Sequence, residues 1–358
     1  MSSNNQKEKQ IRKNILKWYF KNKRNLPWRT SYKHNLPNPY YILISEFMLQ
    51  QTTVNEVIPR FKEFIKLWPN LKKLSITQER QILKFWSGLG YYIRSKRLLK
   101  SAKIISKKYN NQIPSTFADL ITLPGVGVYT AKAIMGIAYN KPVLPLDANI
   151  ERIITRVYCL SESMNKIKKE IFNFSIGLIS KKKSSNLIQG FMDYGSLICT
   201  PIKPHCNKCI ISNKCNAFQN NLTNLIPVKN KNIKMKPKKF TRAYIILNQY
   251  NEVLLRRRPS HGMLQSMLEV PNDEWLDKKK LLKTDKIIKS LSIKHLKLIK
   301  KFIYIFNHYN LNVDIFYTLV SKKKIKNYSW LSLKKTMQSG LPTLMKKIIK
   351  IYMKSIEL

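Results

Sequence analysis

Acidic residues are scarce in this sequence, which has 19 aspartates and glutamates against 67 lysines and arginines in 358 residues. The formal net charge is therefore +48. A chain this positive attracts polyanions, and nucleic acid is the partner that the charge favours. An AT-rich coding sequence would also enrich lysine, asparagine and isoleucine, so the charge is compatible with DNA binding and does not prove it.

Cysteines and long apolar runs are also scarce. The chain has five cysteines, four of them between positions 199 and 215, and this clustering excludes the disulfide framework of a secreted protein. No segment approaches the roughly 18 apolar residues that span a bilayer. We therefore expect a cytoplasmic protein without a membrane partner.

A long segment with helical spacing of apolar residues is followed by a short lysine-rich segment. Residues 8–225 carry apolar side chains at helical spacing, as at Ile150, Ile153, Ile154 and Val157. Residues 229–239 contain six lysines and a proline, which cannot build a core and predict a linker, either a plain tether or one that follows phosphates.

The pattern changes after this linker. Segments rich in β-branched and aromatic residues predict strands at 244–247, 253–255, 302–306 and 313–320, and lysine-rich segments predict helices near 278–290 and 342–354. The prediction is an α-helical domain at 1–225, a basic linker at 226–239 and a smaller α+β domain at 240–358.

Four cysteines lie within one short segment. Cys199, Cys206, Cys209 and Cys215 have the spacing C-x6-C-x2-C-x5-C, which lets four thiolates surround one metal centre. Sulfur ligands suit an iron–sulfur cluster and zinc equally well, so the spacing leaves both open. Cys159 lies apart on a predicted helix, where we expect a small buried apolar side chain.

A glycine-containing turn separates two predicted helices, at 116–123 and 128–139. Thr116 and Asp119 have the spacing of a capping box at the first helix. Gly125 and Gly127 permit a sharp turn, and the free N–H groups of the second helix then form an anion site that suits a DNA phosphate. An ordinary tight corner between helices is the alternative.

Two carboxylates are candidates for chemistry. Glu46 lies among apolar residues on a predicted helix, where burial would raise its pKa and make it a general acid; a place at the solvent edge of the helix is the alternative. Asp147 precedes an apolar helix and is a predicted N-cap. Such a pair can break a glycosidic bond, since one carboxyl protonates the leaving group and the other stabilises a cationic sugar.

Five motifs together resemble the MutY family of adenine DNA glycosylases. They are Leu-Pro-Trp-Arg at 26–29, Ser-Glu-Phe-Met-Leu-Gln-Gln-Thr at 45–52, Trp-Ser-Gly-Leu-Gly-Tyr-Tyr at 86–92, Leu-Pro-Gly-Val-Gly at 123–127 and Met-Asp-Tyr-Gly at 192–195, and the cysteine spacing agrees with them. The resemblance is dense over the first 215 residues and thin after 240.

The resemblance implies an all-α, two-lobed helix-hairpin-helix catalytic domain with an iron–sulfur loop, followed by a Nudix-like domain. It implies a [4Fe-4S] cluster rather than zinc. It also implies a monomer that excises adenine opposite 8-oxoguanine or guanine in double-stranded DNA. By the same match, Glu46 protonates adenine at N7, Asp147 stabilises the oxocarbenium ion and Asn149 helps to hold the site.

The remaining site residues are implied in the same way. Gln51 and Tyr91 match the wedge that replaces the extruded adenine. Arg29 and Gln189 match the adenine pocket, the four clustered cysteines would hold the [4Fe-4S] cluster, and further DNA contacts are expected at Gly125, Gly127, Tyr129, Asn307 and His308.

The second domain resembles the family's 8-oxoguanine reader and has no glutamate-rich Nudix hydrolase box, so we expect it to read DNA rather than hydrolyse nucleotides. The family's Phe-Ser-His loop is Phe306-Asn307-His308 here. An amide both donates and accepts hydrogen bonds but is bulkier than a hydroxyl, so this difference bears on 8-oxoguanine discrimination.

Two other functions fit parts of the pattern. An endonuclease III-like glycosylase/lyase needs a lysine nucleophile just after the hairpin. Tyr129 stands in that place, and Lys132 lies about one helical turn further on. A non-catalytic DNA-binding protein with a structural metal site would also explain the charge, the hairpin and the cysteines, but it has no use for a buried acid.

Overall fold

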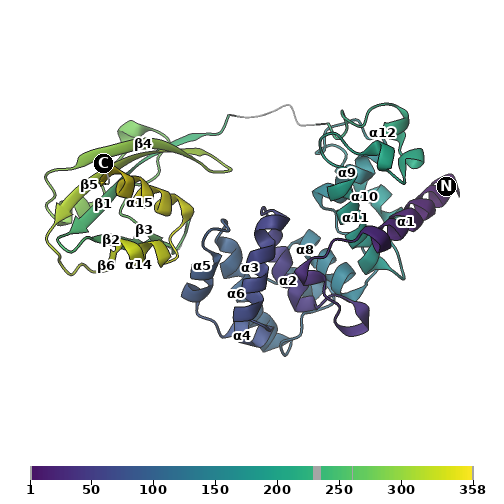
Figure 1. Cartoon of the computed structure of the whole chain (residues 1–358), viewed down its shortest axis with the longest axis horizontal. Coiled ribbons are helices and arrows are strands. Elements are labelled where there is room, and N and C mark those ends of the chain that lie inside the picture. The colour runs from purple at the N-terminus through teal and green to yellow at the C-terminus, as the bar shows by residue number, and fades with distance from the viewer. Residues whose placement is uncertain (1, 229–234, 260, 357–358) are drawn as a thin grey trace. The chain divides into compact units, whose positions relative to one another are not determined.

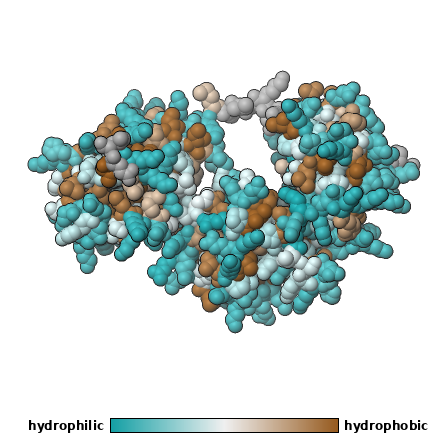
Figure 2. Space-filling view, in the orientation of Figure 1, coloured by the Kyte–Doolittle hydropathy of each residue, from teal (hydrophilic) through white to brown (hydrophobic). Residues whose placement is uncertain are grey.

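The computed structural model describes residues 2–228, 235–259 and 261–356 (Figure 1). The chain forms two compact units. Unit 1 contains Met1–Ile76 and Arg97–Ile233, and unit 2 contains Thr77–Lys96 and Lys234–Leu358. Six residues of the predicted linker, 229–234, lie outside the described residues. Hydrophilic residues cover most of the face seen in Figure 2, and apolar residues form scattered patches on it.

Unit 1 is helical, as the sequence predicts. Its helices are α1 (Ser2–Asn22), α2 (Pro39–Leu49), α3 (Val54–Leu67), α4 (Leu71–Ser75), most of α6 (Ile93–Lys108), α7 (Phe117–Ile121), α8 (Val128–Ala133), α9 (Ala148–Val157), α10 (Lys168–Gly177), α11 (Ser184–Leu197) and α12 (Asn216–Gln219). None of the helices in the described ranges is long and apolar enough to cross a membrane.

Helices α2 and α9 carry the acids of interest, and local sequence explains both. Helix α2 starts at Pro39 after an Asn38 cap, whose side chain accepts from the Tyr40 amide at 2.9 Å, and its apolar side chains are buried on nearly every side. Helix α9 has the predicted stripe: Ile150, Ile153, Ile154 and Val157 are all buried.

The helix–hairpin–helix turn is present, with shorter helices than the sequence predicts. The Thr116 hydroxyl accepts from the Asp119 amide at 3.2 Å and caps α7. Gly125 has a φ of +87°, and a Cβ there would lie 2.7 Å from a ring carbon of Phe47, so this position needs glycine. Gly127 has an ordinary φ of −93° and precedes α8 as its N-cap. After Ala133 the helix continues as a π-helical turn, Ile134–Ala138.

Unit 2 is built on one six-stranded sheet. The strands are β1 (Lys238–Asn248), β2 (Glu252–Arg257), β3 (Leu268–Glu269), β4 (Lys297–Ile305), β5 (Asn310–Val320) and β6 (Tyr328–Ser332). The order is β3-β2-β1-β5-β4, with β6 also paired to β2. The long β1–β5 pair is parallel and the other pairs are antiparallel. The four predicted strand segments lie in β1, β2, β4 and β5, whereas β3 and β6 were not predicted.

Helices cover both faces of this sheet. Ile245 and Leu247 of β1 pack in a core with Ile348 of α15 (Thr343–Ile356). The alternate residues Tyr244 and Ile246 pack against α13 (Lys286–Ser290). Two further helices, α5 (Glu79–Trp86) and α14 (Leu333–Gln338), complete unit 2. The α+β class is therefore confirmed, and the period-two alternation of β1 supplies both cores.

The helix predicted near 278–290 is wrong in its first part. A short 3-10 turn at Lys279–Leu281 is followed by extended chain, and helix resumes only in α13. Arg242 of β1 donates to the Leu282 carbonyl at 3.2 Å and to the Thr284 hydroxyl at 3.3 Å. The Asp285 amide donates to Asp273 at 2.9 Å, so tertiary bonds replace the helical ones.

Candidate active site

A cavity of about 600 Å³ in unit 1 collects seven of the predicted site residues. Its volume lies in the range of small-molecule binding pockets. These residues come from five separate stretches of the chain, and they are Arg29, Glu46, Gln51, Tyr129, Asp147, Asn149 and Gln189.

Glu46 is the buried acid of this cavity, with 7% of its surface exposed. Burial raises the pKa of Glu46 to about 8, and the negative charge of nearby Asp147 adds to the rise. The Tyr129 hydroxyl donates a hydrogen bond to the carboxylate and acts in the opposite direction. The carboxyl is therefore mostly protonated at neutral pH, as the apolar surroundings predict.

Asp147 caps α9, which confirms its predicted local role. Its Oδ1 accepts from the Ile150 amide at 2.8 Å and its Oδ2 accepts from Asn149 Nδ2 at 2.9 Å. These two bonds hold an acceptor-rich carboxylate at the wall of the cavity. The two acids thus have different surroundings: burial favours the protonated form of Glu46, whereas Asp147 accepts two hydrogen bonds.

Asn149 is held in turn by Arg152. Arg152 Nη2 donates to Asn149 Oδ1 at 2.9 Å and to the Gly195 carbonyl at 2.7 Å, and its Nε donates to the Cys199 carbonyl at 2.7 Å. A Cβ at Gly195 would lie 2.6 Å from Asn149 Cβ, so glycine lets α11 approach α9 this closely. The chain of contacts thus runs from Asp147 to the segment that carries the first cysteine.

Arg29 lines the cavity, but its charge already has a partner. Its Nη1 and Nη2 donate to Asp193 at 2.7 and 2.9 Å, and Arg24 donates to the same carboxylate at 2.6 Å. The Asp193 side chain is fully buried. These arginines hold the pKa of Asp193 below its usual range in spite of burial, which alone would raise it.

Gln189 is buried at the cavity, and its amide has one free side. Nε2 donates to the Ser185 carbonyl and hydroxyl, both at 3.1 Å. Oε1 has no hydrogen-bond partner among the described residues. A buried acceptor without a donor is costly, so a ligand that brings an N–H group would relieve it.

The two predicted wedge residues share a strained backbone. Gln51 of unit 1 has a φ of 58° and Tyr91 of unit 2 has a φ of 46°, a conformation that side chains other than glycine rarely adopt. Within unit 2, the Asn307 amide donates to the Tyr91 hydroxyl. Asn307 and His308 are exposed between β4 and β5. Gly125 lies in the hairpin, where its carbonyl accepts from Gln50 at 3.4 Å.

Lys132, the nearest lysine after the hairpin, is placed elsewhere. Its ammonium lies 5.3 Å from the centre of the Phe172 ring. The lining of the 600 Å³ cavity, drawn from the described residues, includes Tyr129 and not Lys132. A lyase nucleophile is therefore missing from the described wall of this cavity.

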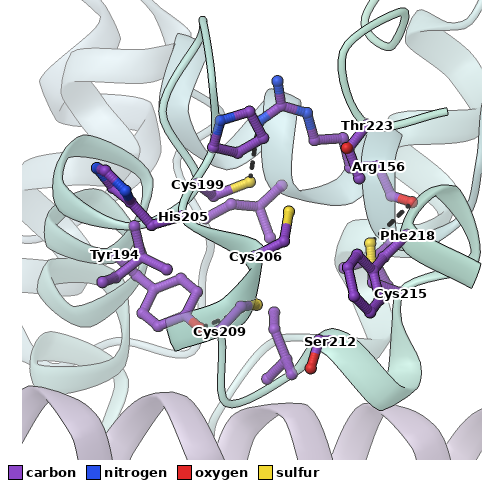
Figure 3. A pocket seen from close by; sticks show the side chains of 15 residues that line it. Arg156, Tyr194, Cys199, His205, Cys206, Cys209, Ser212, Cys215, Phe218 and Thr223 are labelled. Atoms are coloured by element: carbon purple, nitrogen blue, oxygen red, sulfur yellow. Dashed lines mark hydrogen bonds between the residues drawn. The ribbon is translucent and has the colours of Figure 1, made fainter. Parts of the chain in front are cut away.

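The four clustered cysteines line a second cavity, together with Arg156 and Tyr194 (Figure 3). Arg156 Nη1 lies 3.3 Å from Cys199 Sγ and the Tyr194 hydroxyl 3.1 Å from Cys209 Sγ, and both are donors. Within the described ranges, no three metal-binding side chains come close enough together to hold a single metal ion. Cys159 follows the end of α9, half-buried in a small apolar cluster with Cys215.

Sequence reasoning missed three charged residues that organise these two cavities, namely Arg152, Arg156 and Asp193. Each is buried within α9 or α11. Arg152 and Arg156 lie off the apolar stripe of α9, so helical spacing predicts them to be exposed, and their burial follows from partners that the fold brings to them. Arg152 has near partners in Asn149 and the Ala148 carbonyl, but its other partners and those of Arg156 and Asp193 lie more than 40 positions away.

The hairpin and the shared cavity define a base-excision DNA glycosylase of the helix–hairpin–helix class. Residues 44–174 match the HhH-GPD superfamily of base excision DNA repair proteins, and residues 242–351 match the NUDIX domain. The solved structure of a thermostable thymine-DNA glycosylase superposes with a TM-score of 0.55 at 30% identity, covering 60% of this chain and 98% of that one.

Full-length comparison narrows the class. The chain is 34% identical over 356 residues to the adenine DNA glycosylase of Buchnera aphidicola subsp. Schizaphis graminum, covering 94% of this chain and 97% of the relative. It is 25% identical to the human adenine DNA glycosylase, covering 96% and 74%. The chain belongs to the adenine DNA glycosylase family, which confirms the resemblance drawn from the five motifs and the expectation of a DNA repair enzyme.

Proposed function

We propose that this enzyme hydrolyses the N-glycosidic bond of adenine that is mispaired with 8-oxoguanine or guanine in double-stranded DNA. It would act as a monomer in the cytoplasm. The observation that carries the proposal is the protonated Glu46 together with Asp147 in one cavity of about 600 Å³. The relatives are adenine DNA glycosylases, and they supply the identity of the base, adenine.

The reaction begins with extrusion of the adenine, because its glycosidic bond is out of reach inside the duplex. Glu46 gives its proton to N7 of the base as the bond between C1′ and N9 breaks, and the bonding electron pair leaves with adenine. The Asp147 carboxylate stabilises the oxocarbenium ion that remains. Water then adds to C1′ and loses its proton to a carboxylate, which leaves an abasic sugar.

The buried side-chain oxygen of Gln189, Oε1, would select the base. The exocyclic amine of adenine is a donor, and Gln189 Oε1 is a buried acceptor without a partner among the described residues. A purine with a carbonyl in that place would set two acceptors against each other and lose affinity. Arg29 is fixed by Asp193 and so presents a rigid edge rather than a free charge.

The cysteine site offers four thiols, the ligand set of a [4Fe-4S] cluster, which the membership of the adenine DNA glycosylase family favours over zinc. A tetrahedral zinc needs its sulfurs to meet at about 2.3 Å from one point. Among the described residues the thiols surround a cavity without three of them meeting in that way. A [4Fe-4S] cluster separates its ligands, one cysteine to each iron. When bound, it would cross-link the basic loop at 203–214 to the end of α11.

The strand opposite the adenine would be read by Asn307 and His308. Both are exposed, and both lie between the antiparallel strands β4 and β5. The +48 charge would supply affinity that does not depend on sequence. Selectivity would come from these two polar side chains, which can donate and accept at a base edge.

The test offers one set of duplexes to the purified protein: adenine opposite 8-oxoguanine, adenine opposite guanine, and an oxidised pyrimidine opposite guanine. Single-turnover products are read with and without alkali. The expected result is strand cleavage only after alkali and only at adenine. Cleavage without alkali would indicate a lyase, and binding without cleavage on any duplex would indicate a DNA-binding protein.

A further inference from the structure

The turn that carries Asn307 and His308 rests on aromatic side chains. We call residues 306–309, which join β4 and β5, the recognition turn. The Phe306 amide donates to the Tyr309 carbonyl at 2.9 Å and closes the turn. Phe306 and Tyr309 are half-buried, whereas the two residues between them are exposed.

The ring of Trp275 packs against both of these aromatic residues. Its ring centre lies 5.7 Å from that of Phe306 and 6.4 Å from that of Tyr309. Phe306 and Tyr309 are themselves 5.2 Å apart. Both ends of the recognition turn therefore pack on one indole, and a shift of that ring would move the exposed residues with it.

Polar contacts hold the Trp275 ring in place from two sides. Its Nε1 donates to Asn272 Oδ1 at 2.9 Å, and Asn272 Nδ2 donates to Glu269 at 2.6 Å. The Arg258 guanidinium lies 4.4 Å from the ring centre and also pairs with Glu269. The contacts form a closed circuit, Trp275 to Asn272 to Glu269 to Arg258 and back.

The circuit is anchored in the sheet. Glu269 is 1% exposed and also accepts from Arg256 of β2 at 2.9 Å. The positive charges of Arg256 and Arg258 therefore balance the negative charge of this buried carboxylate. The backbone next to Trp275 pairs with β1, where the Phe240 amide donates to the Leu276 carbonyl at 2.8 Å. A four-residue hairpin turn needs no such support to form, since its own backbone hydrogen bond closes it.

We propose that Trp275 is a positioning residue for opposite-base selectivity, with Arg258 and Asn272 fixing its ring. The inference rests on the proposed role of Asn307 and His308 in reading the strand opposite adenine. A reader held rigidly before DNA arrives loses less conformational entropy on binding than a mobile one. Trp275 thus acts through the recognition turn and does not itself contact the base.

The test compares single-turnover excision of adenine opposite 8-oxoguanine with excision opposite guanine. In Trp275→Ala the ratio of the two rates should fall about five- to tenfold, because both ends of the recognition turn lose the ring on which they pack. The rate opposite guanine should stay within about twofold of wild type, because the cavity in unit 1 is unchanged. Trp275→Phe keeps a ring under the turn and loses the Asn272 bond, so its ratio should fall only about twofold.

Trp330→Ala is the matched control. Trp330 also lies in unit 2 and donates its Nε1, to the Lys323 carbonyl at 2.8 Å, but it packs in the core on the side of Tyr244. This variant should leave the ratio unchanged. A fall in its ratio equal to that of Trp275→Ala would overturn the inference, since a general loss of packing in the domain would then explain both.

The triple variant Trp275→Ala/Asn307→Ala/His308→Ala separates this inference from the proposed function. If Trp275 acts through the turn, the triple variant should match Asn307→Ala/His308→Ala, whereas a further fall in the ratio would overturn the inference. A wild-type ratio in Trp275→Ala beside a lowered ratio in Asn307→Ala would overturn it and leave the reading role intact. An unchanged ratio in Asn307→Ala and His308→Ala would remove the reading role itself. If Trp275→Ala does not fold, Trp275→Phe decides, and a wild-type ratio there overturns the inference.

Discussion

Arg152 fixes the orientation of the Asn149 amide, because Arg152 Nη2 donates to Asn149 Oδ1 at 2.9 Å. The nitrogen of that amide then has to face Asp147 Oδ2, to which it donates at 2.9 Å. A reversed amide would set oxygen against carboxylate oxygen. The placement of the sugar-stabilising acid therefore depends on an arginine one turn further along α9, which also binds the Cys199 carbonyl.

Replacing Arg152 by glutamine should lower single-turnover excision about 10- to 100-fold, since a misplacement of roughly 1 Å costs that much. Affinity for the duplex should change less, because Asp147 acts after binding. Arg60→Gln is the control, as Arg60 forms an exposed pair with Glu63 on α3. An Arg152→Gln enzyme with the wild-type excision rate would show that Asn149 needs no support.

Glu46→Gln should abolish excision while binding of the duplex is retained, because an amide has no proton to give to N7. The expected loss is about 10²- to 10⁴-fold, the usual contribution of a general acid. In the wild type, the pKa of about 8 predicts a rate that is level below that pH and falls about tenfold per unit above it. Unchanged excision by Glu46→Gln would remove this residue from its role.

The same group makes stability depend on pH. The folded-state pKa of Glu46 is raised from 4.5 to about 8, so between these values the folded protein binds more protons than the unfolded chain. Its contribution to stability therefore falls as pH rises through this window. Glu46→Gln should be more stable than wild type at pH 8.5, by about 1 to 4 kcal/mol in urea unfolding, and the gain should vanish near pH 4.5. A constant difference across the window would contradict the assignment.

Tyr129→Phe should move the alkaline limb of the pH–rate profile upwards. The Tyr129 hydroxyl stabilises the ionised carboxylate of Glu46 and so lowers its pKa, and removing that donor leaves desolvation less opposed. A shift of about half a unit to one unit is expected, with excision retained. Movement of the limb to lower pH would mean that the hydroxyl serves the protonated acid instead.

Asp193→Asn should cost about 3 to 5 kcal/mol in free energy of unfolding, because it leaves Arg24 and Arg29 facing a neutral buried group. Glu63→Gln is the control, because it removes an exposed carboxylate and should change stability by less than about 1 kcal/mol. Equal effects in the two variants would show that the buried pairs contribute no more than the surface one.

The variants Cys159→Ser and Cys206→Ser should distinguish a cysteine that binds the cluster from one that does not. Cys206 lines the cysteine cavity, whereas Cys159 packs outside it in an apolar cluster. Wild type and Cys159→Ser should contain about four irons and four sulfides per chain and be coloured, and Cys206→Ser should lose both. A colourless wild-type protein with one zinc would contradict the cluster.

Much of the candidate site followed from the sequence because its signals are local. Apolar neighbours made Glu46 a candidate for burial and left the solvent edge of the helix open, and a polar residue before an apolar helix predicted the Asp147 cap. The β-branched and aromatic residues of β1 and the helical spacing along α9 predicted those elements in the same way. Each signal lies within a few residues of the atom that it concerns, so one stretch of chain was enough.

Only the tertiary structure decided which polar groups meet. Arg29 and Asp193 are 164 positions apart, and the parallel pairing of β1 with β5 joins segments that are separated in sequence by three strands and α13. Arg242 of β1 donates hydrogen bonds to residues 282 and 284, and extended chain there replaces the first part of the helix predicted near 278–290. A buried charge requires a partner, but the partner is chosen by packing, and packing depends on the whole fold rather than on any short pattern.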